Sequence, residues 1–218
     1  MDLQSWCCRL VEYKYFLDDK RKAINELEKK NYTTNSIPPF IFARRIIPFF
    51  IFRYSKAPEI LYVDPNLVIG ATVNKYSENS IKKCNEINND YSGSDAFNTV
   101  EYERIGNLPL YIAYEGKNRV RLFQEHQIKI KARVNYTYYP SPSELQLQKS
   151  MLSNDYYLSC SNEFFVQNEN NTVLLLYPEI TVPLFKSYGV KEGKSIKGIS
   201  ITSRKRLLAQ KDLESEKP

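Results

Sequence analysis

The sequence predicts an α+β protein in which a mixed sheet is flanked by helices, with an N-terminal helix and a basic C-terminal tail added. Short runs of alternating apolar and polar residues, as in strands, are interspersed with segments whose apolar residues recur at helical spacing. The chain has 218 residues, of which 42% are hydrophobic, enough for one core. The 17 tyrosines and 11 phenylalanines suit a β-rich core and its margin, and an alternative role for the tyrosines is stacking on bases.

Residues 10–30 are predicted to form an amphipathic helix that ends near Asn31. Such a helix covers one face of a core; the alternative is a coiled-coil dimer, although fewer than three heptads are present. Through this helix or through the tail, the chain is expected to hold a protein partner. The apolar positions recur at three- and four-residue steps, with charged residues between them: Leu10, Tyr13, Leu17, Ile24 and Leu27.

The stretch from Pro38 to Lys56, "PPFIFARRIIPFFIFRYSK", is rich in proline, aromatic and basic residues. Part of it is predicted to be an edge strand, where proline is tolerated. Arg44, Arg45 and Arg53 are candidate nucleic-acid-binding residues, because cations among aromatic rings contact phosphates while the rings stack on bases. The alternative fits the sequence equally well: the same cations lie over aromatic faces at an internal interface.

The remaining elements follow from periodicity and turn signals. Residues 64–66, Asp-Pro-Asn, mark a turn, and residues 88–98 are predicted to be a polar loop. Ser141, with Glu144 three residues later, matches a helix capping box. The predicted strands are residues 60–63, 67–73, 110–114, 128–138, 163–167 and 172–177, and the predicted helices are residues 79–87, 118–126 and 141–152.

Composition divides the chain into three parts: residues 1–56, which hold the helix and the aromatic stretch, a domain from 57 to 185, and a basic, partly disordered tail from 186 to 218. The tail contains nine Lys or Arg and four Asp or Glu, and so carries most of the net charge of +6. A basic protein favours acidic partners such as nucleic acid or nucleotides.

Cysteine usage and hydropathy indicate a cytoplasmic protein. The four cysteines include no C-x-x-C pair and only one histidine is present, which argues against a structural zinc site. The N-terminus lacks the residue order of a signal peptide. The apolar stretch of residues 37–52 is interrupted by arginines and prolines and is too short to span a bilayer, so no membrane association is expected.

The most specific pattern is "LPLYIAYEGKNRVRLFQEHQIKIKARV", residues 108–134, in which a strand gives way to a helix at Gly116. Glycine permits a sharp turn and lets a bound oxyanion approach the backbone. The first turn of a helix has unpaired N–H groups and the positive end of the dipole, which favour phosphate. Lys117 and Asn118 lie in this turn, and Arg119 adds a planar, bidentate donor. The pattern therefore predicts a phosphate site at residues 116–119.

The segment "YIAYEGKNRVRLFQEHQIKIKARV" resembles the second conserved block of ParB N-terminal domains, an apolar strand followed by G-E-R-R-x-R-A-A and a helix. Gly116, Arg119 and Arg121 fall on the glycine and on two arginines of that block. The same turn is similar to the G-C-H-R of sulfiredoxins, which share the fold, but Lys117 replaces the reactive cysteine and excludes reductase chemistry. The resemblance spans residues 60–134, and neither the ParB motif E-N-x-x-R nor a helix-turn-helix pattern follows it.

The resemblance implies a ParB/sulfiredoxin-like fold that binds ATP or CTP at Gly116, Lys117, Asn118 and Arg119. Small stand-alone plasmid effectors of this fold, of the Osa type, combine nucleotide hydrolysis with DNA cleavage, so a hydrolase or nuclease acting on DNA is also implied. The alternative is a non-catalytic DNA- or protein-binding module on the same fold, and the sequence leaves both open. Arg121 is expected to form a salt bridge or to contact the DNA backbone.

If the chain is an enzyme, Glu115 and Arg119 are the candidate catalytic residues. Glu115 is also the candidate ligand for Mg²⁺, with a strand-end carboxylate in solvent as the alternative. Glu101 and Glu103 share a strand face and form either a metal-binding pair or a solvated strand edge. His126, at the end of the predicted helix, is a candidate base or a C-terminal cap.

Overall fold

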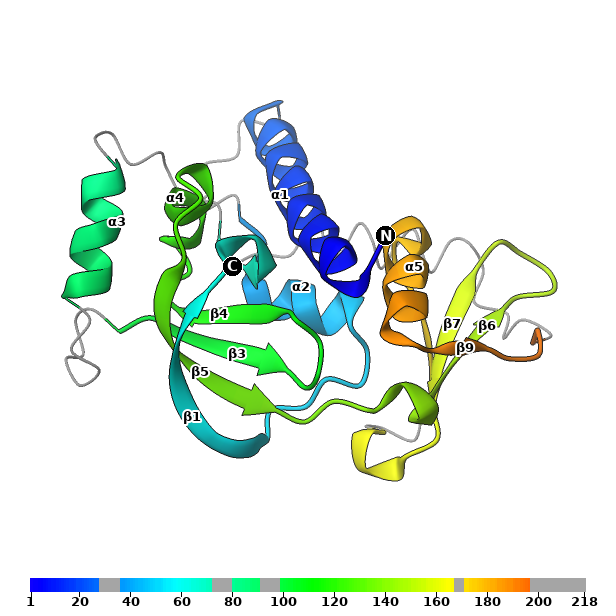
Figure 1. Cartoon of the computed structure of the whole chain (residues 1–218). Coiled ribbons are helices and arrows are strands. Elements are labelled where there is room, and N and C mark those ends of the chain that lie inside the picture. The colour runs from blue at the N-terminus through cyan, green and yellow to red at the C-terminus, as the bar shows by residue number, and fades with distance from the viewer. Residues whose placement is uncertain (28–35, 72–79, 91–98, 167–170, 197–218) are drawn as a thin grey trace.

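The computed structural model describes residues 1–27, 36–71, 80–90, 99–166 and 171–196 (Figure 1). Helices and strands both occur in these ranges, which confirms the α+β class. The helices are α1 (Leu3–Leu27), α2 (Pro39–Ile46), α3 (Ser80–Asn89), α4 (Val120–Glu125) and α5 (Pro178–Tyr188). The strands are β1 (Tyr54–Val63), β2 (Val68–Ile69), β3 (Glu101–Ile105), β4 (Tyr111–Glu115), β5 (Ile130–Thr137), β6 (Leu145–Lys149), β7 (Tyr156–Cys160), β8 (Thr172–Leu174) and β9 (Lys191–Glu192).

The larger sheet is mixed and has the strand order β1-β5-β3-β4-β2 (Figure 1). Strand β5 pairs antiparallel with β1 and parallel with β3, whereas β4 pairs antiparallel with β3 and parallel with β2. The register places Tyr102 of β3 between Ala113 of β4 and Val134 of β5. The predicted strands at residues 110–114 and 128–138 are therefore confirmed, and both lie in the centre of this sheet.

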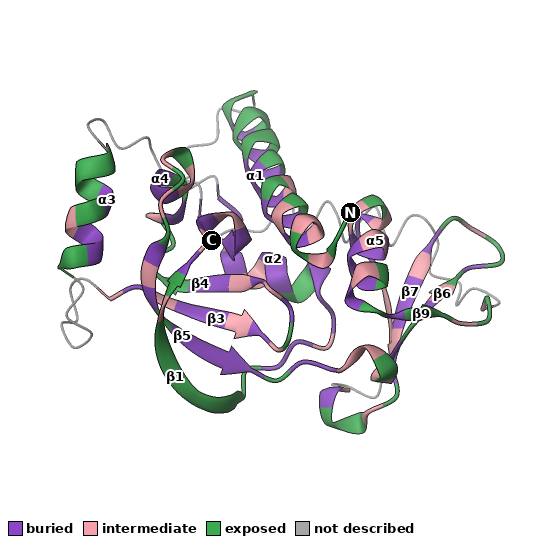
Figure 2. Cartoon of the chain, in the orientation of Figure 1, coloured by how far each residue is buried: buried purple, intermediate pink, exposed green. Residues whose placement is uncertain are grey.

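The two faces of the larger sheet have different neighbours, because alternate residues of a strand point to opposite sides. On one face, Tyr102 and Val134 pack in a buried cluster with Phe123 of α4. On the other face, Ile112 belongs to a second buried cluster that includes Ile46 of α2 and residues of α1. Figure 2 shows the central strands largely buried and β1, at the edge, largely exposed.

Helix α1 covers the core, as predicted, but its buried face is partly polar. Leu10 and Leu17 are buried there, and so are Lys14 and Asp18, one turn apart. The Lys14 ammonium lies 2.5 Å from an Asp18 carboxylate oxygen, and the backbone N–H of Ile37 donates to the other oxygen at 2.8 Å. Asp18 of α1 thus holds the backbone at Ile37, just before α2, against α1.

A smaller sheet, β8-β7-β6-β9, packs with α5 (Figure 1). Leu147 of β6 and Phe185 of α5 belong to the same buried cluster as Ile112 of the larger sheet, so the two sheets share one core. The predicted boundary at residue 185 lies inside α5, and β9 pairs with β6 beyond it. Residues 197–218 of the predicted basic tail lie outside the described residues.

The helix predicted for residues 141–152 is wrong. Residues 142–144 form a single 3₁₀ turn, closed by the Ser141 N–H donating to the Glu144 carboxylate at 2.7 Å. Strand β6 follows, with Leu145 and Leu147 buried and Gln146 exposed. The two-residue spacing of these leucines is the period of a strand. Burial of both leucines therefore favours a strand, and the capping signal closes only the short turn before it.

Part of the stretch 38–56 was predicted to be an edge strand, and this holds only at its end, where residues 54–56 begin the edge strand β1. Pro39 opens α2, because proline lacks only an N–H that the first helical turn leaves unpaired. The strand β1 begins only at Tyr54.

Helix α5 was not predicted, because Pro183 inside it interrupts the usual helix signal. Among the helices described, none is long and apolar enough to cross a membrane.

Candidate functional site

The predicted phosphate turn is present as a sharp turn between β4 and α4. Gly116 has φ +74°, and a Cβ there would come within 3.2 Å of the Val100 methyl groups. The Arg119 N–H donates to the Gly116 carbonyl at 2.9 Å, which closes the turn. The Ala71 N–H donates to the Lys117 carbonyl at 3.0 Å and ties the turn to the end of β2. Glycine is therefore required at 116 by both conformation and packing.

Arg119 directs part of its charge toward the protein interior. One terminal guanidinium nitrogen is buried, and its neighbour is the fully buried Tyr102 of β3. Burial raises the pKa of Tyr102, and the positive charge of Arg119 partly offsets this rise. Lys117 and Asn118 are the exposed side chains of the turn. The helix that follows has only six residues, so its dipole is small.

Arg121 lies at a different place from the turn, in a cleft of about 410 Å³ between α1 and α4. Its guanidinium lies 4.9 Å from the ring centroid of Tyr15 and 3.7 Å from the carboxylate of Glu125. The expected salt bridge is thus confirmed, although both partners are about half exposed and the pair stabilises the fold little. His126 occupies the C-cap position of α4, as the capping interpretation predicted.

Of the candidate carboxylates, Glu101 and Glu103 share one face of the larger sheet, whereas a register shift separates Glu115 from that pattern. Glu115 is exposed at the end of β4 and lies opposite Glu101 in the register. The side-chain amide of Asn135 donates to both Glu101, at 2.8 Å, and Glu103, at 3.1 Å. Glu103 is buried, so the interpretation of a solvated strand edge is wrong for this residue. In the described part of the chain, no three or more His, Cys, Asp or Glu side chains gather as metal-site ligands.

Arg44 and Arg53 meet at a second cleft of about 500 Å³. The guanidinium of Arg44 lies 5.6 Å from the ring centroid of Phe52, and that of Arg53 lies 5.4 Å from the centroid of Phe164. Phe52 is 44% exposed and Phe164 is 46% exposed, so both rings border solvent. Ile51 forms the apolar part of the lining.

Further rings extend this cleft into a continuous band. Phe40 of α2 contacts Phe52, with centroids 4.8 Å apart, and Tyr114 of β4, with centroids 5.8 Å apart. On the other side, Tyr138 contacts Phe164 at 5.7 Å. We name the set the aromatic–basic surface: Phe40, Arg44, Phe52, Arg53, Tyr114, Tyr138 and Phe164.

Local structure explains why these side chains face outward. Phe50 and Ile51 are buried between α2 and β1, so the next two residues, Phe52 and Arg53, are turned toward solvent. The Tyr138 N–H donates to the Arg53 carbonyl at 3.1 Å and holds this segment against the end of β5. Arg44 is exposed in the last turn of α2, where a cation also interacts favourably with the helix dipole.

Of the candidate nucleic-acid-binding residues, the structure brings together Arg44 and Arg53. Arg45 is exposed beside Arg44 on α2, whereas Arg121 belongs to the other cleft. The cations do lie over aromatic rings, as the second alternative expects, but at an exposed surface and not at an internal interface, and their contact with nucleic acid stays a prediction. The sequence did not single out Phe164, because its place beside Arg53 depends on the packing of residues 111 positions apart in the chain.

Comparisons with known proteins assign the chain to no family. The chain matches no protein-family model, no curated protein and no solved structure. The ParB/sulfiredoxin-like fold and the nucleotide site therefore stay predictions from the sequence.

Proposed function

We propose that this protein binds single-stranded nucleic acid through the aromatic–basic surface. The observation that carries the proposal is the second cleft, where two exposed arginines lie over two exposed phenylalanine rings. Single strands expose the faces of their bases, and aromatic rings beside cations bind them by stacking and by phosphate contacts. A duplex hides those faces, so the rings favour a single strand.

The charges of Arg44 and Arg53 are available to phosphates. Within the described part of the chain, neither guanidinium forms an ion pair with a carboxylate. Contact with the rings of Phe52 and Phe164 restricts both guanidinium groups, which lowers the entropy lost when a phosphate binds. The net charge of +6 favours approach of a polyanion.

Fluorescence anisotropy with a labelled single strand of about 15 nucleotides tests the proposal. DNA and RNA strands and a DNA duplex are compared between roughly 50 and 200 mM salt. We expect single strands to bind more tightly than the duplex. Arg44→Ala and Arg53→Ala should each weaken binding and lower the slope of log K against log salt by about 0.7.

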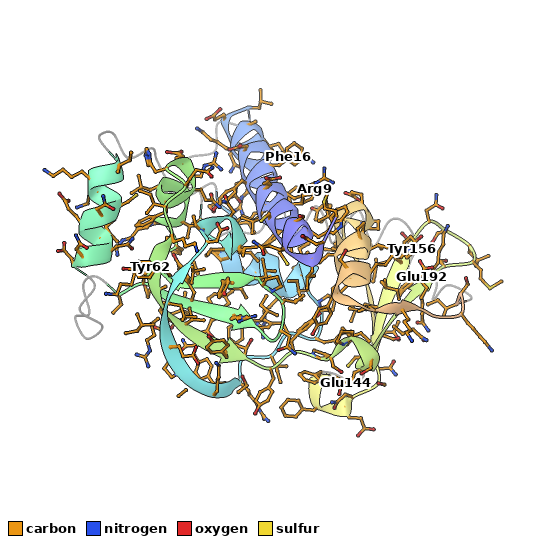
Figure 3. The ribbon with its side chains drawn as sticks, viewed as in Figure 1. Arg9, Phe16, Tyr62, Glu144, Tyr156 and Glu192 are labelled. Atoms are coloured by element: carbon orange, nitrogen blue, oxygen red, sulfur yellow. The ribbon has the colours of Figure 1, made fainter. Side chains whose placement is uncertain are left out.

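Arg9→Ala is the matched control for the arginine variants. Arg9 lies 5.3 Å from the ring centroid of Trp6 and makes the same kind of contact, but on α1 and outside the second cleft (Figure 3). It should bind the single strand like the wild-type protein. An equal loss of affinity in Arg44→Ala, Arg53→Ala and Arg9→Ala would show that binding depends on net charge alone. That result would contradict binding at the aromatic–basic surface.

A second candidate function is binding of ATP or CTP phosphates at residues 116–119. The observation that favours it is the positive φ of Gly116, with Lys117 and Asn118 exposed beside it. Mg²⁺ at Glu115 and hydrolysis of the nucleotide or cleavage of DNA would follow from this site. Calorimetry with ATP and CTP should show binding that is lost in Arg119→Ala. Unchanged affinity in a folded Arg119→Ala protein would remove this candidate.

A further inference from the structure

We infer that the cleft between α1 and α4 binds a linear polyamine, with one terminal ammonium group at Glu12 and the other at Asp19. Both side chains are exposed and line this cleft of about 410 Å³. Within the described part of the chain, neither carboxylate forms an ion pair or a hydrogen bond. Space and negative charge are thus both available to a ligand. The site lies apart from the aromatic–basic surface and does not rest on the proposed function.

The spacing of the two carboxylates selects an extended ligand. Asp19 follows Glu12 by seven residues in α1, close to two helical turns, so both lie on one side of the helix and about 10 Å apart along its axis. A metal ion holds its oxygen ligands within about 2.6 Å and cannot bridge that distance. A chain with a positive charge at each end can meet both carboxylates at once.

Aromatic rings flank the path between the carboxylates. Tyr15 and Phe16 lie between Glu12 and Asp19 on α1, and both line the cleft. Tyr15 is buried, whereas Phe16 is 57% exposed and borders solvent (Figure 3). Methylene groups pack on such rings, and ammonium groups are attracted to their faces. The lining therefore suits the alternating methylene and ammonium groups of a polyamine.

The charges around the cleft favour a cation. Arg121 borders it from α4, but its guanidinium lies 3.7 Å from the carboxylate of Glu125, which offsets its charge. Cys8 also lines the cleft. Burial raises the pKa of its thiol, and the charges of Asp64 and Glu12 add to this rise. The potential here is therefore negative, although the chain as a whole carries a net charge of +6.

Tyr15 and Gln124 supply an independent observation for a ligand. Tyr15 is only 6% exposed, and its hydroxyl has no hydrogen-bond partner within the described part of the chain, because the nearby Gln124 lacks the geometry of a hydrogen bond. The amide nitrogen of Gln124 donates to the Pro65 carbonyl at 2.8 Å, whereas its buried Oε1 is also unmet there. Buried acceptors without donors are costly, and ammonium groups are donors only.

Calorimetric titration of the full chain with three amines, in the absence of nucleic acid, tests the inference. Between terminal nitrogens, extended spermidine spans about 11 Å and putrescine about 6 Å, at roughly 1.25 Å per bond. An eight-carbon diamine has the span of spermidine but lacks its central charge. We expect both long amines to bind one per chain. Putrescine should bind at least about fivefold more weakly than the eight-carbon diamine, because it reaches only one carboxylate at a time.

Glu12→Gln and Asp19→Asn should each weaken binding of the eight-carbon diamine by about fivefold and remove its advantage over putrescine. Both positions are exposed, so the variants should fold, which circular dichroism checks. Glu26→Gln is the matched control, because it removes an exposed carboxylate of the same helix outside the cleft, and it should keep wild-type affinity. Putrescine binding as tightly as the eight-carbon diamine, equal losses in all three variants, or no binding of either long amine would overturn the inference.

Discussion

At the scale of single residues, the chemistry depends on what covers each side chain. Arg119 was expected to face an anion and one interpretation left Glu103 in solvent, yet both place charged atoms inside the protein. The sequence correctly put Glu101 and Glu103 on one face, because that follows from the two-residue period of a strand. It could not show that Tyr54 and Asn135 close over Glu103, because both contacts join distant parts of the chain.

Gly116 offers the most direct residue-scale prediction. Gly116→Ala should destabilise the protein by about 1–2 kcal/mol, because alanine is strained at positive φ. The added Cβ would also press on the Val100 methyl groups, 3.2 Å away. Urea unfolding followed by circular dichroism measures the change.

Gly116→Asn is the comparison variant, because asparagine tolerates the left-handed conformation better than alanine. It should lose less stability than Gly116→Ala. Equal stability of the alanine variant and the wild-type protein would show that the turn relaxes to a negative φ and that the geometry described for residues 116–119 is not fixed.

At the scale of elements, the spacing of apolar residues predicted helices and strands correctly where only one period was present. It failed where a capping signal or a proline conflicted with that spacing. Strands β4 and β5 and helix α4 were predicted because their apolar positions fit a single period. Residues 141–152 carry a capping signal and a two-residue period at once, and the burial of Leu145 and Leu147 decides for the strand. Helices α2 and α5 contain prolines that obscured their helical pattern.

The buried Lys14–Asp18 pair of α1 gives the prediction for this scale. Asp18→Asn should cost about 3–5 kcal/mol, because it leaves the buried Lys14 ammonium without its charge partner. Burial already lowers the pKa of Lys14, and Asp18 opposes that shift. The double variant Lys14→Met/Asp18→Leu should lose less stability than Asp18→Asn alone, since it removes both charges of the pair together.

A double-mutant cycle of unfolding free energies measures this coupling. The exposed pair Lys22–Glu26, 3.9 Å apart on the same helix, is the control and should contribute less than about 1 kcal/mol. If Asp18→Asn lowers the free energy of unfolding by less than about 1 kcal/mol, as expected for the exposed pair, Lys14 is neutral or hydrated in the folded protein. Asp18 then does not anchor the segment before α2.

At the scale of the whole molecule, the candidate interface arises only from the tertiary arrangement. The sequence predicted the α+β class and singled out Arg44 and Arg53 from their aromatic surroundings. It did not predict that α2, the end of β4 and the segment after β7 would meet around them, because that requires the strand order of the larger sheet and its contact with the smaller one. Candidate cations were thus predictable, but their stacking partners were not.

The most direct test of the proposed interface is the affinity of ring variants for a single strand. Phe52→Ala and Phe164→Ala should each weaken binding by a factor of about 5 to 150, because stacking contributes about 1–3 kcal/mol per base. Phe16→Ala, at a ring that is 57% exposed on α1, is the control and should bind like the wild-type protein. Wild-type affinity in both Phe52→Ala and Phe164→Ala would contradict the account.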